Sequence, residues 1–326
     1  MFTLITLFLA ALTVIYILKT AEVNNGRKTA EEKYAEAQIK KLSTPQAVSK
    51  LSVLPLIDSQ SLDETFKTEN GVSYLIQADD KQILLDVGYN KNKEHPSPLL
   101  QNMSQLGKSF DEIDAIVFSH LHLDHVGGME EQKSGEFSLS QGKVETPDIP
   151  VYAPAPLKPS KNNPQFSKIT VSKNPTEIMP GIYTIGTIPR QLFLIGYIEE
   201  QALAFNLAEK GIVLLIGCGH QTIQRILERT QTLFDLPVYA VIGGLHLPLK
   251  GETFFSKIQY LVGSDYAPPK GLKEQDVYNA IDSLKKANVQ LVAISPHDST
   301  EWSIQQFRNA FGEKYVDVKV GKEITL

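Results

Sequence analysis

A short histidine-rich segment, SHLHLDHVGG, constrains this chain more than any other feature of its sequence. The chain has seven histidines in 326 residues, and three of them, His120, His122 and His125, lie within six residues of one another together with Asp124. An apolar run, DAIVF, leads directly into the segment, which predicts a strand followed by a loop. Two glycines follow and let the backbone pack closely. Such a loop can turn several imidazoles toward one point.

These residue types are typical of a metal site. Neutral imidazoles and carboxylates are ligands of zinc and of similar borderline metals. Four such side chains on one loop exceed what a single tetrahedral ion needs when it also keeps an open position for water. The segment therefore predicts two adjacent divalent metal ions. Zn²⁺ is the expected metal, with Mn²⁺ or Fe²⁺ as alternatives.

Further candidate side chains follow other apolar, strand-like runs. If these strands share a sheet and end on one edge, their terminal side chains converge there, as sites do in open α/β sheets. The candidates are Asp86 in ILLDVG, Cys218 and His220 in LLIGCGH, His246 in VIGGLH, and His297 with Asp298 in VAISPHD.

Three of these candidates have an equally natural supporting role. A cysteine at the end of an apolar strand is more often a small hydrophobic residue than a ligand, so Cys218 is expected beside the ligands rather than among them. Asp86 can hold a ligating histidine from outside, or form the turn before Gly88. His246 is compatible with a satisfied core histidine as well as with a role at the site.

Composition narrows the class of protein. With 42% hydrophobic residues and 21% charged residues, the chain can bury a large core. The formal net charge is −5, so the composition gives no indication of a basic surface that would bind nucleic acid. A single cysteine excludes an intramolecular disulfide and a thiolate-rich zinc cage.

The first 18 residues carry no charged side chain and just reach the length of a membrane-spanning helix. A cleaved signal peptide is the alternative, but no basic residue precedes the run and no small-x-small site follows it. We therefore expect an uncleaved single-pass anchor over residues 1–18. Basic residues follow at Lys19, Arg27, Lys28 and Lys33, which favours a cytoplasmic body without fixing the side of the membrane.

Beyond the anchor, the composition changes twice. Residues 19–50 are rich in Ala, Glu and Lys, which indicates a polar helical or flexible stalk. From residue 51 to residue 326, strand-like runs come first and helical periodicity follows, as in a layered α/β domain. Residues 130–180 hold many Pro, Ser, Asn and Lys residues and predict an irregular surface excursion. One catalytic domain behind an anchor and a stalk is the expected organisation.

The segment SHLHLDHVGG, with ILLDVG upstream, resembles the metallo-β-lactamase superfamily. The ordered landmarks GIYTIGTIPR, GIVLLIGCGHQTI, VIGGLHL and SPHDST are similar to one branch of it. That branch is named for the archaeal synthase that joins a dihydropterin to ribofuranosylaminobenzene 5'-phosphate, and its members are often labelled dihydropteroate-synthase-related. The resemblance covers roughly residues 51–300. It implies an αββα sandwich, in which two mixed β-sheets carry helices on their outer faces.

The resemblance also implies a ligand set. One metal would be held by His120, His122 and His220, and the other by Asp124, His125 and His297. The chain departs from the branch at four places, namely Asn70, Leu121, Gly219 and the residues after His297, where Asp298-Ser299-Thr300 replaces the usual Cys-Thr-Gly. A hard carboxylate thus stands where a soft thiol is usual, which favours another metal preference or an added acid–base group.

The predicted function is a metal-dependent hydrolase that uses a metal-activated hydroxide on an ester, a phosphoester or a similar small molecule. Asp124 is expected to orient the attacking water, and His246 or Asp298 to assist proton transfer. Arg190 is a candidate for binding an anionic group, although a surface arginine is an equal reading. The alternatives are a pterin-type condensing transferase that releases pyrophosphate and a non-catalytic, metal-binding membrane protein. The sequence leaves the substrate and the oligomeric state open.

Overall fold

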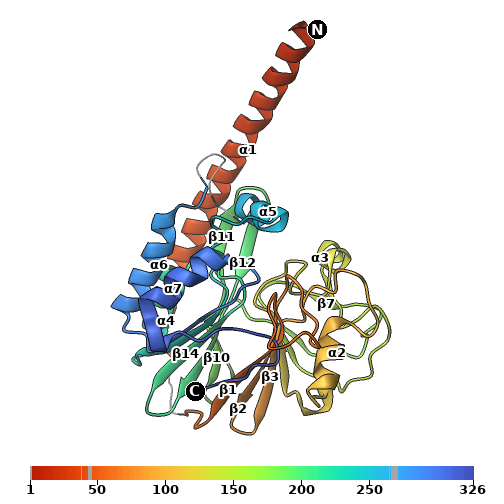
Figure 1. The fold of residues 1–326 in the computed structure, drawn as a ribbon, viewed down its shortest axis with the longest axis vertical. Coiled ribbons are helices and arrows are strands. Elements are labelled where there is room, and N and C mark those ends of the chain that lie inside the picture. The colour runs from red at the N-terminus through yellow and green to blue at the C-terminus, as the bar shows by residue number, and fades with distance from the viewer. Residues whose placement is uncertain (1, 38, 43–45, 264, 266–270) are drawn as a thin grey trace.

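The computed structural model describes residues 2–37, 39–42, 46–263, 265 and 271–326. Two mixed β-sheets face each other and helices cover their outer faces (Figure 1). The first sheet has the order β17 (Ile324–Thr325), β1 (Leu51–Ile57), β2 (Ser73–Ala78), β3 (Lys81–Leu85), β4 (Ala115–Val117), β6 (Val151–Ala153) and β8 (Ile169–Val171). The second has the order β16 (Leu291–Ile294), β15 (Val238–Gly243), β14 (Gly211–Ile216), β13 (Leu203–Leu207), β10 (Ile182–Thr184) and β9 (Thr176–Met179). The predicted αββα sandwich is confirmed.

Two small two-stranded sheets, one parallel and one an antiparallel hairpin, and the helices complete the fold. The pairs are β5 (Glu136–Phe137) with β7 (Lys158–Pro159), and β11 (Ile188–Leu192) with β12 (Gly196–Glu200). The helices are α1 (Phe2–Glu36), α2 (Pro98–Gln105), α3 (Met129–Ser134), α4 (Ile223–Leu233), α5 (Phe254–Val262), α6 (Glu274–Lys286) and α7 (Glu301–Phe311), with short 3₁₀ turns at Phe110–Glu112 and Gly312–Lys314. Residues 130–180, expected to be irregular, thus contain one short helix and several short strands.

The strand directions bring the candidate residues to one edge of the sandwich. In the first sheet β3 and β4 are parallel, and in the second β14, β15 and β16 are parallel. The carboxyl ends of parallel strands meet at the same edge of a sheet. The histidine-rich loop follows β4, and the loops that carry the later histidines follow β14, β15 and β16.

Strand β14 shows why these segments become buried strands. All of its residues are buried, and alternate side chains point to opposite faces of the sheet. Val213 and Leu215 lie in the core between the two sheets, with Tyr74 and Phe205, whereas Leu214 lies in the core under the helices. A strand covered on both faces has to be apolar throughout, which explains the continuous run GIVLLI.

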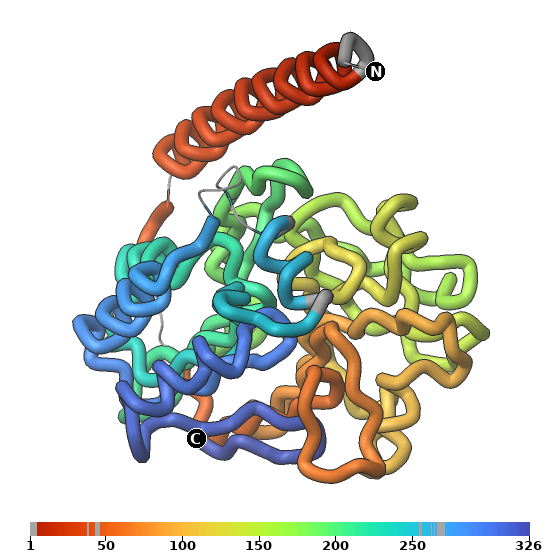
Figure 2. The backbone as a smooth tube through the Cα atoms, turned by 45° about the horizontal axis from the view of Figure 1, so that its top comes forward, coloured from red at the N-terminus to blue at the C-terminus, as the bar shows by residue number. Residues whose placement is uncertain are grey.

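Helix α1 is continuous from its apolar half into its polar half. The N-terminal half projects away from the domain (Figures 1 and 2), and its apolar side chains are exposed, Leu18 to 64%. In the described part of the chain it is the one helix long and apolar enough to cross a membrane, over Ile5–Glu36. Length and composition alone support that role, because a signal sequence passes the same test.

The second half of α1 packs against the domain. Val23 and Ala30, two turns apart on one face, are buried. Glu31 forms an ion pair with Arg225 of α4. The part of the expected stalk that lies in α1 is therefore a docked helix; residues 38 and 43–45 of that stalk lie outside the described residues. The division of the chain at residues 18 and 50 stays a prediction.

One buried amide fixes the long connection between β1 and β2. Asn102 of α2 is fully buried, and its Nδ2 donates to the carbonyl oxygens of Leu56, at 2.7 Å, and Lys67, at 2.8 Å. Its Oδ1 accepts the backbone N–H of Lys67 at 2.8 Å. This side chain thus forms hydrogen bonds with three buried backbone groups, which would otherwise lack a partner.

We expect Asn102→Ala to lower the free energy of unfolding by about 2 kcal/mol or more, because it leaves buried backbone groups unpaired. The matched control is Ser104→Ala on the exposed side of the same helix, which should change that free energy by no more than about 0.5 kcal/mol. Urea denaturation of the two variants measures the difference. Equal loss of stability in both would show that Asn102 does not hold this segment.

Candidate metal centre

The histidine-rich loop is held at its start by a carboxylate from the neighbouring strand. Asp86, directly after β3, is fully buried and accepts the backbone N–H of Ser119 at 2.8 Å and its hydroxyl at 2.7 Å. The same carboxylate lies 2.7 Å from Nδ1 of His125. This contact turns Nε2 of His125 toward the interior of the site. Asp86 thus occupies the position expected of a carboxylate that orients a ligand.

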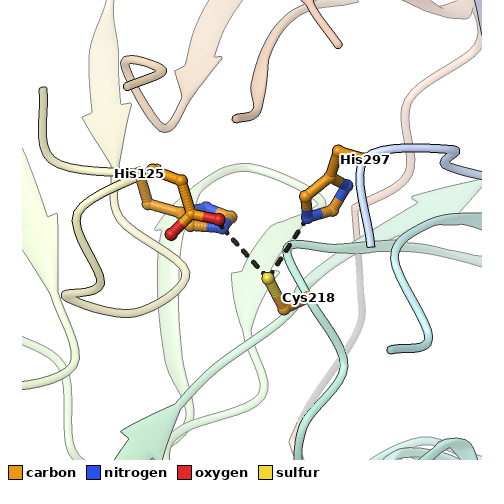
Figure 3. Close-up of side chains that lie close together, drawn as sticks. His125, Cys218 and His297 are labelled. Carbon is orange, nitrogen blue, oxygen red and sulfur yellow. Dashed lines mark hydrogen bonds and ion pairs between the residues drawn. The ribbon is translucent and has the colours of Figure 1, made fainter. Parts of the chain in front are cut away.

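The thiol of Cys218 lies at the centre of the site. Its Sγ is 3.1 Å from Nε2 of His125 and 3.2 Å from Nε2 of His297 (Figure 3). Donor atoms within 4.8 Å of one another form three groups, and Cys218 belongs to all of them: with Asp124, His125 and His297; with His120 and His220; and with His246 and Asp298.

This geometry differs from the expectation that Cys218 stands outside the ligand set. The apolar run before it suggested a core residue, and the residue is indeed buried. Its sulfur, however, faces imidazole nitrogens from two distant loops rather than apolar neighbours alone. The approach of those loops is a tertiary feature that the local sequence does not encode.

Three imidazoles face one another on one side of the thiol. Nε2 of His120 lies 3.0 Å from Nδ1 of His122, and the His220 ring centroid lies 5.0 Å from that of His120 and 5.1 Å from that of His122. Rings at these separations can direct nitrogen lone pairs at one ion. His120 and His220 have donor atoms within 4.8 Å of one another and of the sulfur of Cys218, which gives nitrogen and sulfur donors of the kind that zinc prefers.

On the other side of the thiol, a carboxylate joins two imidazoles. Oδ2 of Asp124 is 3.7 Å from Nε2 of His125, and the ring of His297 lies across from that of His125 at 5.7 Å between centroids. These three side chains and Cys218 form the second group of donors. Thiol, imidazole and carboxylate donors gathered in this way would suit a divalent cation such as zinc, so the residues present fit the metal that the sequence predicts.

Glu200 supports the loop that carries Cys218. This carboxylate, at the end of β12, is fully buried and accepts the backbone N–H groups of Cys218, Gly219 and His220 at 3.1, 2.7 and 2.9 Å. It also lies 3.1 Å from Nδ1 of His220. Burial raises its pKa to about 7, against the effect of the three amide donors. Sequence reasoning missed Glu200, whose signal was an acidic residue three positions before the buried strand β13.

Asp58 plays a similar part for His297 through an intermediate serine. Nδ1 of His297 is 2.6 Å from Oγ of Ser295, which donates to Oδ2 of Asp58 at 2.6 Å. The same oxygen accepts the hydroxyl of Tyr74 at 2.7 Å. Burial raises the pKa of Asp58 to about 6, although its hydrogen bonds act in the other direction. The sequence analysis did not single out Asp58 either.

His246 and Asp298 form the third group of donors with Cys218. Oδ2 of Asp298 accepts the backbone N–H of His246 at 2.9 Å and lies 3.8 Å from Nε2 of His297. Both ring nitrogens of His246 are buried without a hydrogen-bond partner among the described residues, and its ring lies 4.5 Å from that of His220. Burial lowers the pKa of His246 to about 3, so its imidazole is neutral.

Burial also sets the protonation of the ligand candidates. It lowers the pKa of His120, His122 and His297 well below the usual value, with a further contribution from neighbouring histidines. For His125 burial acts in the same direction, but the carboxylates of Asp86 and Asp124 outweigh it and raise the pKa to about 9. Because a metal binds only the neutral ring, protonation of His125 and metal binding compete.

A cavity of about 520 Å³ opens next to His220 and His246. Arg190 and Leu192 of β11 line one side, and the start of α4 and polar residues of α6, such as Asn279 and Ser283, line the others. Arg190 forms an ion pair with Asp265 in this wall. The structure thus brings Arg190 to the same cavity as the candidate ligands. His95, in contrast, lies apart, with Nδ1 2.8 Å from the hydroxyl of Ser140.

Comparison with known proteins finds similar sequences over different parts of the chain. The family model described as anti-Pycsar protein Apyc1 matches residues 64–148. A 7,8-dihydropterin-6-methyl-4-(beta-D-ribofuranosyl)-aminobenzene-5'-phosphate synthase of Methanocaldococcus jannaschii is 26% identical over 234 residues, which cover 58% of this chain and 75% of that protein. The anti-Pycsar protein Apyc1 of Paenibacillus harenae is 40% identical over 57 residues, 18% of this chain and 20% of that protein.

Solved structures match most of the chain at low identity. Tm1679, described as a metal-dependent hydrolase of the β-lactamase superfamily, superposes with a TM-score of 0.57 at 19% identity, covering 85% of this chain and 99% of that one. Zn²⁺-bound PqqB from Methylobacterium extorquens superposes with a TM-score of 0.50 at 11% identity, covering 84% and 100%. The chain has the metallo-β-lactamase fold. The resemblance stated from the sequence is therefore confirmed.

The metallo-β-lactamase fold explains how separate parts of the chain build one site. The segment matched by the Apyc1 family includes Asp86 and the histidine-rich loop but ends before β9. Cys218, His220 and His297 come from the second sheet, outside that match. Half of the site thus lies on each sheet, and only the folded sandwich joins the halves.

A spectroscopic prediction follows from the position of Cys218. When Co²⁺ is added to the metal-depleted protein, we expect the near-ultraviolet charge-transfer band of a thiolate bound to Co²⁺, because the sulfur lies among the donors of both groups. Cys218→Ser, which keeps a similar volume, should lose that band, whereas His95→Ala should keep it. A band that survives in the serine variant, or is absent from the wild-type protein, would place the sulfur outside the ligand set.

Proposed function

We propose that this protein is a metal-dependent hydrolase with two divalent cations, Zn²⁺ being the expected metal and Mn²⁺ or Fe²⁺ the alternatives. The observation that carries the proposal is the set of three donor groups that share the sulfur of Cys218, two of which contain histidines predicted as ligands. A mixture of thiolate, imidazole and carboxylate donors suits zinc better than the all-oxygen sites of Mg²⁺ or Ca²⁺. The similarity in fold to a protein described as a metal-dependent hydrolase supports the same reaction class.

In this proposal His120, His122 and His220 hold one cation, and Asp124, His125 and His297 hold the other, with Cys218 between them. In each of these two sets of ligands, a buried carboxylate contacts the outer nitrogen of one histidine, and the other ring nitrogen of that histidine faces the centre of the site. Glu200 contacts Nδ1 of His220, and Asp86 contacts Nδ1 of His125. Such outer contacts fix ring orientation and increase ligand basicity.

Bound divalent cations would lower the pKa of water toward neutrality and polarise the bond under attack. The chain's own groups would do the rest. Asp124, at the edge of the donor group, accepts a hydrogen bond from the attacking water and orients it. The imidazole of His246, which lines the cavity, would assist proton transfer at a ring nitrogen. Asp298 positions that ring through the His246 backbone N–H.

The substrate class in this proposal is a small molecule with an ester, phosphoester or similar bond. The cavity beside His220 and His246 has the volume of a small-molecule site. Arg190 on its wall offers a planar guanidinium suited to a phosphate or carboxylate group. An anionic substrate is therefore favoured.

A second candidate function has one observation in its favour. The 26% identity to the pterin synthase of M. jannaschii extends over 58% of this chain. In that case the site would promote condensation and release pyrophosphate from a dihydropterin pyrophosphate donor. Release of pyrophosphate, measured with that donor, separates the transferase from the hydrolase. A metal-binding membrane protein without catalysis would show turnover in neither assay.

The membrane anchor is also part of the proposal. The apolar half of α1 projects from the domain, and the helix continues without a break into the half that docks on it. We propose that residues 1–18 form a single-pass anchor, that the catalytic domain begins near residue 51, and that the docked half of α1 connects the two.

We expect His122→Ala and Asp124→Asn to reduce the rate of hydrolysis of phosphodiester, lactone and ester probes by more than about 100-fold. Loss of a residue that only supports a ligand typically costs about 10- to 100-fold, and loss of a ligand should cost more. Metal analysis should show fewer than two ions per chain in both variants. His95→Ala, away from the site, should match the wild-type protein in metal content and rate. Unchanged metal content and rates in the first two variants would contradict the proposed centre.

Arg190→Gln is expected to raise the KM for anionic probes by about tenfold while leaving neutral esters almost unaffected, because it removes a charge-assisted hydrogen bond to the anion. Arg308→Gln on α7 is the control, since that arginine pairs with Glu301 and Asp317 away from the cavity. Steady-state kinetics with charged and neutral probes of equal size measures the effect. Equal changes in KM for the charged and the neutral probes would mean that Arg190 does not bind the anionic group of the substrate.

A further inference from the structure

We infer that the β11–β12 hairpin is a second membrane contact, whose tip enters the bilayer interface beside α1, and that the substrate is an anionic amphiphile held in that bilayer. The statement about the substrate rests on the proposed hydrolase function. The statement about the hairpin rests on the surface of the molecule and on α1 as an anchor.

The tip of the hairpin is apolar where turns are usually polar. Phe193, Leu194 and Ile195 connect the two strands, and Leu194 and Ile195 are 47% and 42% exposed. Hairpin turns normally consist of Gly, Asn, Asp or Ser, and consecutive exposed apolar residues are unusual on the surface of a soluble domain. Tyr197, on the returning strand, is also exposed. An apolar surface of this kind indicates a partner that is itself apolar.

The tip lies at the level where α1 changes from apolar to charged. The ring of Phe193 is 6.4 Å from that of Tyr16, between centroids. Tyr16 stands three residues before Lys19, the first charged side chain of the helix. Tyrosine prefers the boundary between hydrocarbon and water. If α1 crosses a bilayer with its apolar half, the hairpin tip therefore reaches the interface of that same bilayer.

Close contacts keep the hairpin and α1 in fixed positions. A Cβ at Gly26 of α1 would overlap the side chain of Gln191 in β11, so the helix approaches the strand as closely as glycine allows. Further along, the ammonium of Lys33 lies 3.2 Å from the hydroxyl of Tyr197 and 4.5 Å from the centre of its ring. The hairpin and the helix thus move as one unit, and the depth of the helix sets the depth of the tip.

The same hairpin forms one wall of the cavity. Leu192 and Arg190 line the cavity and precede Leu194 by two and four residues. Because Leu194 lies in the turn after β11, the rise of an extended strand sets upper limits of about 7 Å for Leu192 and about 14 Å for Arg190 from Leu194. The polar layer on each side of a bilayer is about 5–7 Å thick. With the hairpin tip in the bilayer interface, the cavity therefore begins near the outer limit of the lipid head groups. Arg190 lies further from the bilayer, at a height that the anionic end of a long head group would reach.

A bilayer is favoured over another protein as the occupant of the tip. The exposed apolar surface of the tip continues directly onto the apolar, exposed half of α1. A protein partner would have to cover both surfaces, whereas a bilayer that contains α1 covers the tip without any further component. The position of Tyr16 at the junction agrees with the bilayer.

The hairpin is tested with the full chain in phosphatidylcholine–phosphatidylglycerol vesicles. Leu194→Cys is labelled with an environment-sensitive fluorophore, and Val171→Cys on β8, with a similarly exposed parent residue at 39%, is the matched control. Cys218 is buried, so an unmodified chain treated with the same label gives the background.

We expect a blue-shifted emission at position 194 and its quenching by spin-labelled lipids, with neither at position 171. Emission at 194 as in water, without quenching, would overturn the membrane contact. A blue shift that lipid quenchers do not affect, together with cross-linking between labelled chains, would replace the bilayer by a second copy of the chain.

The substrate class is tested with two p-nitrophenyl phosphodiesters. Both carry a tri(ethylene glycol) spacer, which ends in a hexadecyl chain in one probe and in a methyl group in the other. With vesicles present, kcat/KM for the hexadecyl probe should exceed that for the methyl probe by at least about tenfold, because enzyme and probe share one surface.

The double variant Leu194→Ser/Ile195→Ser should lose this advantage and keep its rate on the methyl probe, whereas Val171→Ser should keep both. Equal kcat/KM for the two probes in the wild-type protein would overturn the amphiphilic substrate. If the label at 194 is quenched and neither probe is hydrolysed, the membrane contact stands and the proposed phosphoester hydrolysis fails. The two parts of the inference can thus fail separately.

Discussion

The hydrogen bonds of Asp86 are the contacts on which the rest of the site depends. This carboxylate follows β3, is fully buried, and accepts both the backbone N–H and the hydroxyl of Ser119, the first residue of the histidine-rich loop after β4. Since it also contacts Nδ1 of His125, it fixes the start and the end of that loop together. A buried carboxylate is costly unless its oxygens are satisfied, and here the satisfying groups are the ones that the site must hold in place. Fold stability and ligand geometry therefore rest on the same contacts.

The same arrangement occurs on the second sheet. Glu200 accepts hydrogen bonds from three backbone N–H groups of the turn after β14. Asp58 accepts a hydrogen bond from Ser295, whose hydroxyl also contacts Nδ1 of His297. In each case a carboxylate that follows one strand holds a loop that follows another. Each supported imidazole then has its outer nitrogen occupied and its inner nitrogen facing the centre, as ligating histidines generally do. The convergence on Cys218 thus results from buried acidic groups behind the candidate ligands as much as from the candidate ligands themselves.

The sequence predicts the parts of this structure that depend on local pattern. Apolar runs such as GIVLLI predict buried strands, and a common edge for parallel strands predicts that the histidine-rich loop and the later candidate histidines converge. The central place of Cys218 was not predictable in this way, because a thiol after an apolar run fits a core position and a ligand position equally well. Glu200 and Asp58 have ordinary acidic contexts, and only the neighbouring strands show that they are buried. The docking of α1 was missed because Val23 and Ala30 are small residues in a polar, Ala-rich segment.

That docking bears on what the protein acts on. If residues 19–50 were a flexible linker, their random-coil dimensions would let the site range over roughly 30 Å from the membrane. Instead, the contact at Gly26 and the ion pair of Glu31 with Arg225 hold α1 against the domain. A fixed height confers no advantage in capturing a substrate dissolved in water, which reaches the site equally well at any height. It does favour a substrate that stays in the bilayer, because the head group of such a molecule arrives only within a narrow range of heights. In the proposed membrane-anchored protein, the rigid connection between helix, hairpin and cavity therefore favours a substrate held in the membrane over one in solution.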